Sequence, residues 1–316
     1  MKVPSSRFGP DSRRAHWPRV LMVIGIALLV ALVAMFALLV ARQRTPLLAI
    51  GQTERPQDAI ALWNEQDYEG VVEVSTEQLV EFPLDPTALG LRGFSRFYLA
   101  MQAVNSDSRE QALIASIRDL RRVLLTDVAE LEPEVHYVLG KAYFHRGEYF
   151  YDAAVRHLER ARALGWNRLD LLEYLALASR DLGRREDAVR YFREAIEQGD
   201  EPVHRIALAD VLIADSSYRE ADVLLSRAIA QTSDSTLIQD ALVSLGTSLR
   251  LQERWNAAMD TYRRLLEVNE ASAEAHYGLG EVYLALGEQD QARFEWREAI
   301  RLDPNHIESL QRLQEY

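Results

Sequence analysis

The stretch that decides the fold is residues 273–306, with the sequence AEAHYGLGEVYLALGEQDQARFEWREAIRLDPNH. Its first half predicts a helix with Leu279 and Gly280 on one face. Its second half predicts a helix with Ala292 and Trp296 on one face, and a glycine and a proline mark the turn and the end. The glycine allows the two helices to cross closely, and the tryptophan fills the space beside it. The stretch is therefore predicted to form a helical hairpin.

The spacing of this hairpin recurs upstream at intervals of about 34 residues. In the unit furthest upstream Leu139 and Gly140 keep their places, but the second-helix residues Ala154 and Leu158 arrive two positions late, which predicts a longer turn. Repetition of a two-helix unit predicts an all-α solenoid. Its five units are residues 133–168, 169–201, 202–238, 239–272 and 273–306.

The repeated residues resemble the tetratricopeptide-repeat (TPR) family, whose pattern is W-x2-L-G-x2-Y, then A-x3-F-x2-A, then P. The match in residues 273–306 is nearly complete, with His276 in the place of the tryptophan. The resemblance is specific over residues 133–316 and weaker over residues 55–132. It implies a hairpin solenoid that binds proteins or peptide segments and needs no cofactor.

Both ends of the repeat array depart from the pattern. Residues 55–132 are predicted to form one or two degenerate TPR-like repeats, in which the polar tract at 103–110 is an expanded turn. Residues 307–316 are predicted to form a capping helix, started by Asn305, that covers the last apolar face. Residues 42–54 are interpreted as a linker.

A membrane segment is predicted near the N-terminus. Residues 20–41 are 22 consecutive residues without a charge, which as a helix would cross a lipid bilayer at about 1.5 Å per residue. Arg42 and Arg44 follow directly and make a poor cleavage site, so an uncleaved anchor is favoured over a signal peptide. Five basic residues in the tail 1–19 favour a cytoplasmic N-terminus and a body outside.

Composition and motifs exclude several function classes. Residues 1–44 hold seven basic residues and one acidic residue, which leaves 29 basic and 47 acidic residues, a net charge of −18, for residues 45–316. An acidic body argues against nucleic-acid binding. Cysteine is absent from the sequence, and no catalytic, cofactor-binding or metal motif has the required spacing, so no catalytic, cofactor or metal residue is assigned. His136 and His276 take the tryptophan position and are interpreted as packing residues.

The family resemblance implies a groove lined by the first helix of each unit. The positions that line it are Tyr137, Lys141, Phe144, Glu173, Leu177, Arg180, Ile206, Asp210, Ile213, Val243, Thr247, Arg250, Tyr277, Glu281 and Leu284. TPR proteins that bind chaperone tails carry basic residues at the leading groove positions. Here those positions are Tyr137, Glu173, Ile206, Val243 and Tyr277, so this mode of binding is not expected.

The sequence as a whole predicts a non-enzymatic scaffold in a bacterial inner membrane, with a periplasmic TPR body that assembles or organises a cell-envelope complex. Two alternatives stay open. One is a cytoplasm-facing adaptor that regulates a membrane enzyme. The other is an enzyme with its site in the irregular residues 55–132. The partner, the pathway and the oligomeric state are not predicted.

Overall fold

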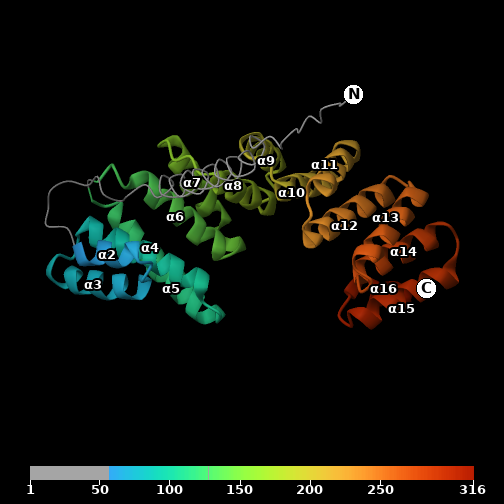
Figure 1. The fold of residues 1–316 in the computed structure, drawn as a ribbon, viewed down its shortest axis with the longest axis horizontal. Coiled ribbons are helices and arrows are strands. Elements are labelled where there is room, and N and C mark those ends of the chain that lie inside the picture. The colour runs from blue at the N-terminus through green and yellow to red at the C-terminus, as the bar shows by residue number, and fades with distance from the viewer. Residues whose placement is uncertain (1–56, 127) are drawn as a thin grey trace, which may run out of the picture. The chain divides into compact units, whose positions relative to one another are not determined.

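The computed structural model describes residues 57–126 and 128–316, and every regular element in these residues is a helix (Figure 1). One of them is a short 3-10 helix, η1. The helices are α2 (Gln57–Asn64), α3 (Tyr68–Glu81), α4 (Pro86–Gln102), α5 (Ser106–Val123), α6 (Glu132–His145), η1 (Glu148–Phe150), α7 (Tyr151–Ala163), α8 (Leu169–Asp181), α9 (Arg185–Gln198), α10 (Pro202–Ala214), α11 (Tyr218–Gln231), α12 (Ser235–Leu251), α13 (Trp255–Val268), α14 (Ala273–Ala285), α15 (Gln289–Leu302) and α16 (Ile307–Glu315).

Consecutive helices pack in pairs within the compact unit Glu54–Tyr316. Helix α4 packs on α5, α6 on α7, and so on to α14 on α15, and the hairpins follow one another in chain order (Figure 1). First helices also contact the first helix of the next hairpin, as α6 does α8 and α12 does α14. The unit is therefore a hairpin solenoid with a layer of first helices and a layer of second helices.

Close helix crossings at glycine occur in the α6–α7, α12–α13 and α14–α15 hairpins. A Cβ atom added at Gly246 would lie 2.5 Å from Cε1 of Tyr262, and one added at Gly140 would lie 2.5 Å from Cγ of Leu158. The same substitution at Gly280 would place a Cβ against the indole of Trp296, which is fully buried. The glycine and the large side chain of the partner helix thus fit one another, as the sequence pattern predicts.

The turns between helices explain two details of the sequence. The connection from α6 to α7 contains η1, which accounts for the two-residue delay in the unit that begins at residue 133. In the last unit Gly287 has a φ of 83°, a left-handed conformation that favours glycine at the end of a helix.

Two predictions about helix starts are wrong. Residues 106–110 are the first residues of α5, not part of an expanded turn, because the Asn105 side chain accepts a hydrogen bond from the backbone N–H of Asp107 at 2.7 Å. The cap of α16 is His306, not Asn305. Nδ1 of His306 accepts from the backbone N–H of Ser309 at 3.2 Å, whereas the backbone N–H of Asn305 donates to Asp303.

The predicted tail 1–19, membrane helix 20–41 and linker 42–54 lie outside the described residues. Within residues 57–126 and 128–316, no helix is both long enough and apolar enough to cross a membrane.

Candidate functional site

The fifteen predicted groove residues lie on five successive first helices, α6, α8, α10, α12 and α14. Most are half-buried, as expected for positions that border a groove. Ile206 and Glu281 are buried, and Arg180 and Asp210 are exposed. Their role in binding stays a prediction, but their side chains differ sharply between the two ends of the row.

At the N-terminal end of the row the side chains are aromatic and contact one another through Lys141. Nζ of Lys141 lies 2.9 Å from Oδ2 of Asp170 and donates to the Tyr137 hydroxyl at 3.2 Å. The ammonium also lies over the rings of Phe97 at 5.7 Å and of Tyr174 at 4.8 Å. These contacts connect α4, α6 and α8, so the predicted groove residues Tyr137 and Lys141 already have partners in their own chain.

Burial sets the protonation of this aromatic end. It raises the pKa of Tyr174 to about 12, helped by Asp170, and raises the pKa of Tyr137, whose hydroxyl donates to Asp170. Burial and the nearby Lys141 lower the pKa of His145 to about 4. Both tyrosines and the histidine are therefore neutral at pH 7, and Lys141 with Asp170 supplies the charge of this region.

The structure adds four carboxylates to the predicted groove. Glu134, Asp170, Asp240 and Glu274 each lie three residues before a leading groove position, about one helical turn away. The sequence carries this signal, since an acidic residue recurs at the same offset in four of the five units. Burial raises the pKa of Glu134 to about 7, opposed by the positive charge of Arg168.

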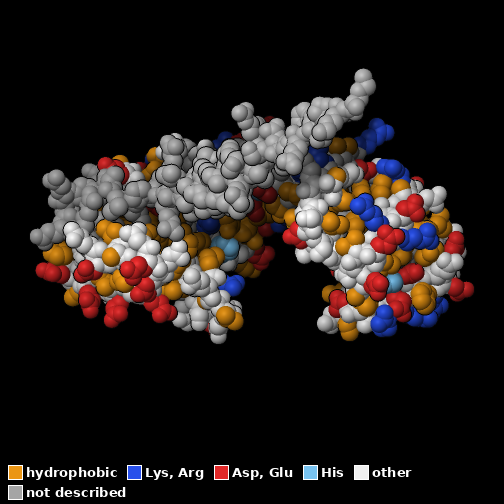
Figure 2. All heavy atoms as spheres, in the orientation of Figure 1, with side chains coloured by type: hydrophobic (Ala, Val, Ile, Leu, Met, Phe, Trp, Pro, Cys, Tyr) orange, Lys and Arg blue, Asp and Glu red, His pale blue; other side chains and the backbone are white. Residues whose placement is uncertain are grey.

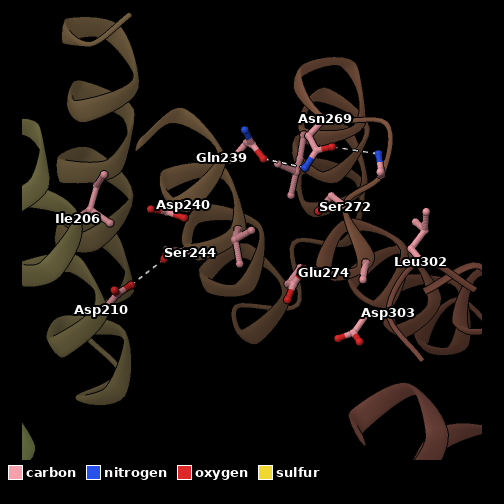
Figure 3. Close-up of a pocket in the computed structure, with 14 residues that line it drawn as sticks. Ile206, Asp210, Gln239, Asp240, Ser244, Asn269, Ser272, Glu274, Leu302 and Asp303 are labelled. Carbon is pink, nitrogen blue, oxygen red and sulfur yellow. Dashed lines mark hydrogen bonds between the residues drawn. The ribbon is translucent and has the colours of Figure 1, made fainter. Parts of the chain in front are cut away.

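At the C-terminal end of the row the first helices α10, α12 and α14 border a hollow of about 640 Å³ (Figure 3). We call it the acidic hollow. It is lined by apolar residues, by small polar residues and by four carboxylates. Its members are Ile206, Asp210, Gln239, Asp240, Val243, Ser244, Leu265, Asn269, Ala271, Ser272, Ala273, Glu274, Leu302 and Asp303.

Two hydrogen bonds fix the walls of the acidic hollow (Figure 3). The Ser244 hydroxyl in α12 donates to Asp210 in α10 at 2.6 Å, and the Asn269 amide donates to Gln239 in α12 at 2.8 Å. Asn269 also accepts from the backbone N–H of Ala271 at 3.0 Å, which holds the turn before α14. The walls are therefore set by contacts within the chain and do not require a ligand.

The charge of the acidic hollow is of one sign. No Lys, Arg or His is among the described residues that line it, and Asp240 and Glu274 make no ion pair with any described residue. Although Asp210 as a residue is exposed, loss of water around its carboxyl group raises the pKa of that group, and Asp240 also raises it. The hydrogen bond from Ser244 and the positive charge of Arg180, which does not line the hollow, lower the same pKa. Elsewhere the charges are mixed, as the interspersed red and blue side chains over α13–α16 show (Figure 2). The hollow is suited to a cation on an apolar stem.

Two predicted groove residues near the C-terminus are engaged by the capping helix. Glu281 is 7% exposed and is bound by Arg312 of α16 at 2.7 Å, with Arg250 at 3.8 Å. The ring of Tyr277 lies 5.2 Å from that of His306. The cap therefore closes the row of first helices at this end.

The histidines pair within hairpins. Nδ1 of His136 lies 2.8 Å from Nδ1 of His157, and Nδ1 of His276 lies 2.6 Å from Glu295. Within the part of the chain that the structure describes, no group of three His, Asp or Glu side chains is placed to hold a metal ion.

Comparisons with known proteins agree with the helical-repeat fold. A family model described as TPR repeat matches residues 246–287, and one described as tetratricopeptide repeat matches residues 273–306. No curated protein matches the chain. Among solved structures, the C-terminal part of a TPR repeat-containing protein from Cytophaga hutchinsonii is 15% identical, with a TM-score of 0.61 over 81% of this chain and 98% of that one.

Two further solved structures have lower TM-scores. MamA from Desulfovibrio magneticus RS-1 is 16% identical, with a TM-score of 0.49 over 57% of this chain and 99% of that one. The Cut9–Hcn1 hetero-tetramer of the APC/C is 17% identical, with a TM-score of 0.49 over 82% of this chain and 54% of that one.

The fold and the row of first-helix side chains define a helical-repeat protein built from a layer of first helices and a layer of second helices. Two family models identify tetratricopeptide repeats in residues 246–306, and the solved structure from C. hutchinsonii shares its fold with 81% of this chain.

Proposed function

We propose that this TPR protein is a non-enzymatic scaffold that binds other proteins, and that the acidic hollow takes a partner segment carrying an arginine or lysine next to an apolar side chain. The observation that carries this proposal is the uncompensated charge of the hollow. Asp240 and Glu274 lie beside the apolar Ile206 and Val243, with no ion pair to any residue in 57–126 or 128–316. The charged end of an arginine or lysine side chain would pair with the carboxylates, and its aliphatic stem would pack on the apolar side chains.

The location of the scaffold is part of the proposal. Residues 20–41 would anchor the chain in a bacterial inner membrane, with the TPR body in the periplasm and the partners in a cell-envelope complex. The support is the charge-free run and the basic tail that precedes it. A C-terminal alkaline phosphatase fusion tests the orientation. An inactive fusion would favour the cytoplasm-facing adaptor.

The binding proposal is tested by placing a photo-crosslinking amino acid at Val243 of the full-length chain in cells and identifying the attached segment by mass spectrometry. The captured segment is then synthesised, and its affinity is measured for the wild type and for Asp240→Asn/Glu274→Gln. We expect at least a tenfold loss of affinity in the double variant, about 1.4 kcal/mol or more. Exposed Glu267 lies on α13, a second helix, and Glu267→Gln is the matched control.

Three results would count against the proposal. The captured segments could lack basic residues, the double variant could bind them as the wild type does, or Val243 could capture nothing while a site on a second helix does. An enzyme in residues 55–132 would instead predict turnover that survives both groove substitutions.

A further inference from the structure

A second hollow lies on the second helix α5, beside Arg146 at the end of α6, and none of the fifteen predicted groove residues lines it. It has a volume of about 430 Å³, and α5 with the turn after it supplies most of the lining. We call it the arginine hollow. Its members are Ile114, Ile117, Arg118, Arg121, Arg122, Leu125 and Arg146.

The spacing of these residues makes one stripe along α5. Ile114, Arg118 and Arg121 follow one another at intervals of four and three, so they lie on one face of α5, and Leu125 lies in the turn just after the helix. Ile114 is 45% exposed and Leu125 is 83% exposed, so two large aliphatic side chains border the hollow in contact with solvent. Ile117 is 6% exposed and forms the floor. The stripe therefore has two arginines between two exposed apolar side chains.

The arginines of this hollow are only partly neutralised. Arg146 is paired with Glu110 at 2.7 Å, and Arg122 donates to the backbone carbonyl of Pro83. Arg118 and Arg121 make no hydrogen bond or ion pair with any residue that the structure describes. The hollow thus keeps an excess of positive charge in a body whose net charge is −18.

The carboxylate nearest in sequence does not supply this charge balance. Asp119 is fully buried on the other side of α5, where it binds Arg92 at 2.8 Å and also Arg96. Its charge is used inside the α4–α5 hairpin. The guanidinium groups of Arg118 and Arg121 therefore face solvent beside an apolar floor. A guanidinium group in this position can bind a carboxylate through two parallel N–H···O hydrogen bonds.

We propose that the arginine hollow binds an acidic segment of a partner protein, in which carboxylates flank one aliphatic side chain. The aliphatic side chain would enter between Ile114 and Leu125, and the carboxylates would pair with Arg118 and Arg121. This surface is separate from the acidic hollow in position and opposite to it in charge, so the proposal does not depend on the function assigned to the groove.

A protein segment fits this hollow better than an anionic bilayer does. The hollow is concave, so it receives a protruding side chain, whereas a bilayer presents a flat array of headgroups. The contact from Arg122 to Pro83 places the α3–α4 turn beside the end of α5. Helix α3 exposes Glu73, Glu77 and Glu81, which would repel an extended anionic bilayer surface, whereas a short acidic segment confined to the hollow does not have to cover them.

The test uses the full-length chain in neutral detergent and a short fluorescein-labelled peptide with one leucine between glutamate and aspartate residues. A matched peptide carries glutamine and asparagine instead. We expect fluorescence anisotropy to show binding of the acidic peptide that weakens with salt, and at least tenfold weaker binding of the neutral peptide. Arg118→Gln/Arg121→Gln should weaken binding of the acidic peptide at least tenfold, and Arg227→Gln on α11 should leave it unchanged.

Arg118 and Arg121 have exposed side chains, so the variant in which glutamine removes both charges is expected to fold. Circular dichroism checks that its helix content is unchanged. Equal binding of the two peptides, or unchanged binding by the double arginine variant, would overturn the proposal. It would also be overturned if the acidic peptide failed to bind while hydrogen exchange showed α5 protected in nanodiscs containing phosphatidylglycerol and not in nanodiscs of phosphatidylcholine alone. That last result would make the surface a membrane contact.

Discussion

The ammonium of Lys141 in α6 lies 2.9 Å from a carboxylate oxygen of Asp170 in α8. Lys141 is one of only two lysines in the sequence, and its side chain is 17% exposed. Since the same ammonium lies over rings from α4 and α8, one cation joins three successive first helices. The contact is therefore a joint between repeats at the aromatic end of the row.

Replacing Lys141 with methionine should loosen this joint. The methionine keeps most of the apolar stem but removes the charge, so the ion pair and the cation–π contacts are lost together. We expect a decrease of about 1–2 kcal/mol in the free energy of unfolding, measured with urea. Arg227→Met on the exposed face of α11 is the control and should change stability by less than about 0.5 kcal/mol. If the two substitutions change the free energy of unfolding equally, the contacts of Lys141 do not stabilise the packing between repeats.

The repeat spacing was enough to predict the all-α hairpin fold, because each hairpin depends on residues close in sequence. Gly280 and Trp296 are one such pair, and their fit needs no information from other repeats. The start of α5 was mispredicted by a few residues, and the cap of α16 was mispredicted by one residue. There the result depended on which of several neighbouring polar side chains accepts the backbone N–H, and Asn105 and His306 were the ones that did.

The site could be predicted only in outline. The family pattern indicates which helix faces line a groove, but it does not indicate which of those side chains find partners in their own chain. Lys141 is held by Asp170, and Glu281 is held by Arg312, which lies in the capping helix. Such pairings depend on side-chain geometry across repeats. The unpaired state of Asp240 and Glu274 follows from that geometry as well, so spacing alone does not reveal the acidic hollow.

Adding a methyl group at Gly280 should destabilise the last hairpin. A Cβ there would overlap the buried indole of Trp296, and an overpacked core costs about 1–3 kcal/mol. Gly90→Ala in α4 is the matched control, because a Cβ at Gly90 would meet its nearest atom only at 3.8 Å. In a helix interior that change should be neutral or stabilising by up to about 1 kcal/mol. Urea denaturation of both variants measures the difference, and a Gly280→Ala protein as stable as Gly90→Ala would contradict the close crossing.

Removing the buried carboxylate of Asp119 should destabilise the α4–α5 hairpin strongly. Asp119 binds Arg92 and Arg96, and its loss would leave two guanidinium groups in a largely buried site without a counter-charge. We expect Asp119→Leu to cost about 3–5 kcal/mol, measured by urea denaturation. Adding Arg92→Met and Arg96→Met should restore much of that stability, since the uncompensated charges are then gone. If the triple variant is no more stable than Asp119→Leu, lost packing and not charge is the cause.

Acid should weaken the α6–α7 hairpin through His136 and His157. Burial lowers the pKa of both histidines. The pKa of His157 falls to about 4, because the nearby His136, Arg156 and Arg121 add to the effect of burial. A folded pKa below the unfolded value of about 6.5 means that protonation favours the unfolded chain. This contribution is therefore complete above pH 6.5 and is lost as the pH falls towards 4, with only Glu132 opposing the loss at His136.

A series of thermal denaturation curves between pH 7 and pH 4.5 measures this effect. His157→Gln cannot be protonated, so its Tm should fall by about 2–5 °C less than that of the wild type over this range. His276→Gln serves as the control, because that histidine pairs with Glu295 in a different hairpin. An acid slope in His157→Gln equal to that of the wild type would show that the histidine pair does not govern the response.

The acidic hollow should cost the protein stability. Asp210 and Asp240 repel one another across it, and Asp240 and Glu274 gain no ion pair from any described residue, so neutralising them removes repulsion and breaks no bond. We expect Asp240→Asn/Glu274→Gln to be about 0.5–1 kcal/mol more stable than the wild type in urea, and the gain should shrink as salt screens the charges. Glu281→Gln is the matched comparison and should be destabilising, since Glu281 is buried and bound by Arg312. A stabilised double variant that also loses its partner would mean that the hollow keeps its carboxylates for binding, because residues that reduce stability are retained where function needs them. A destabilised one would mean that these carboxylates support the fold, and the case for a binding site here would lose its main physical support.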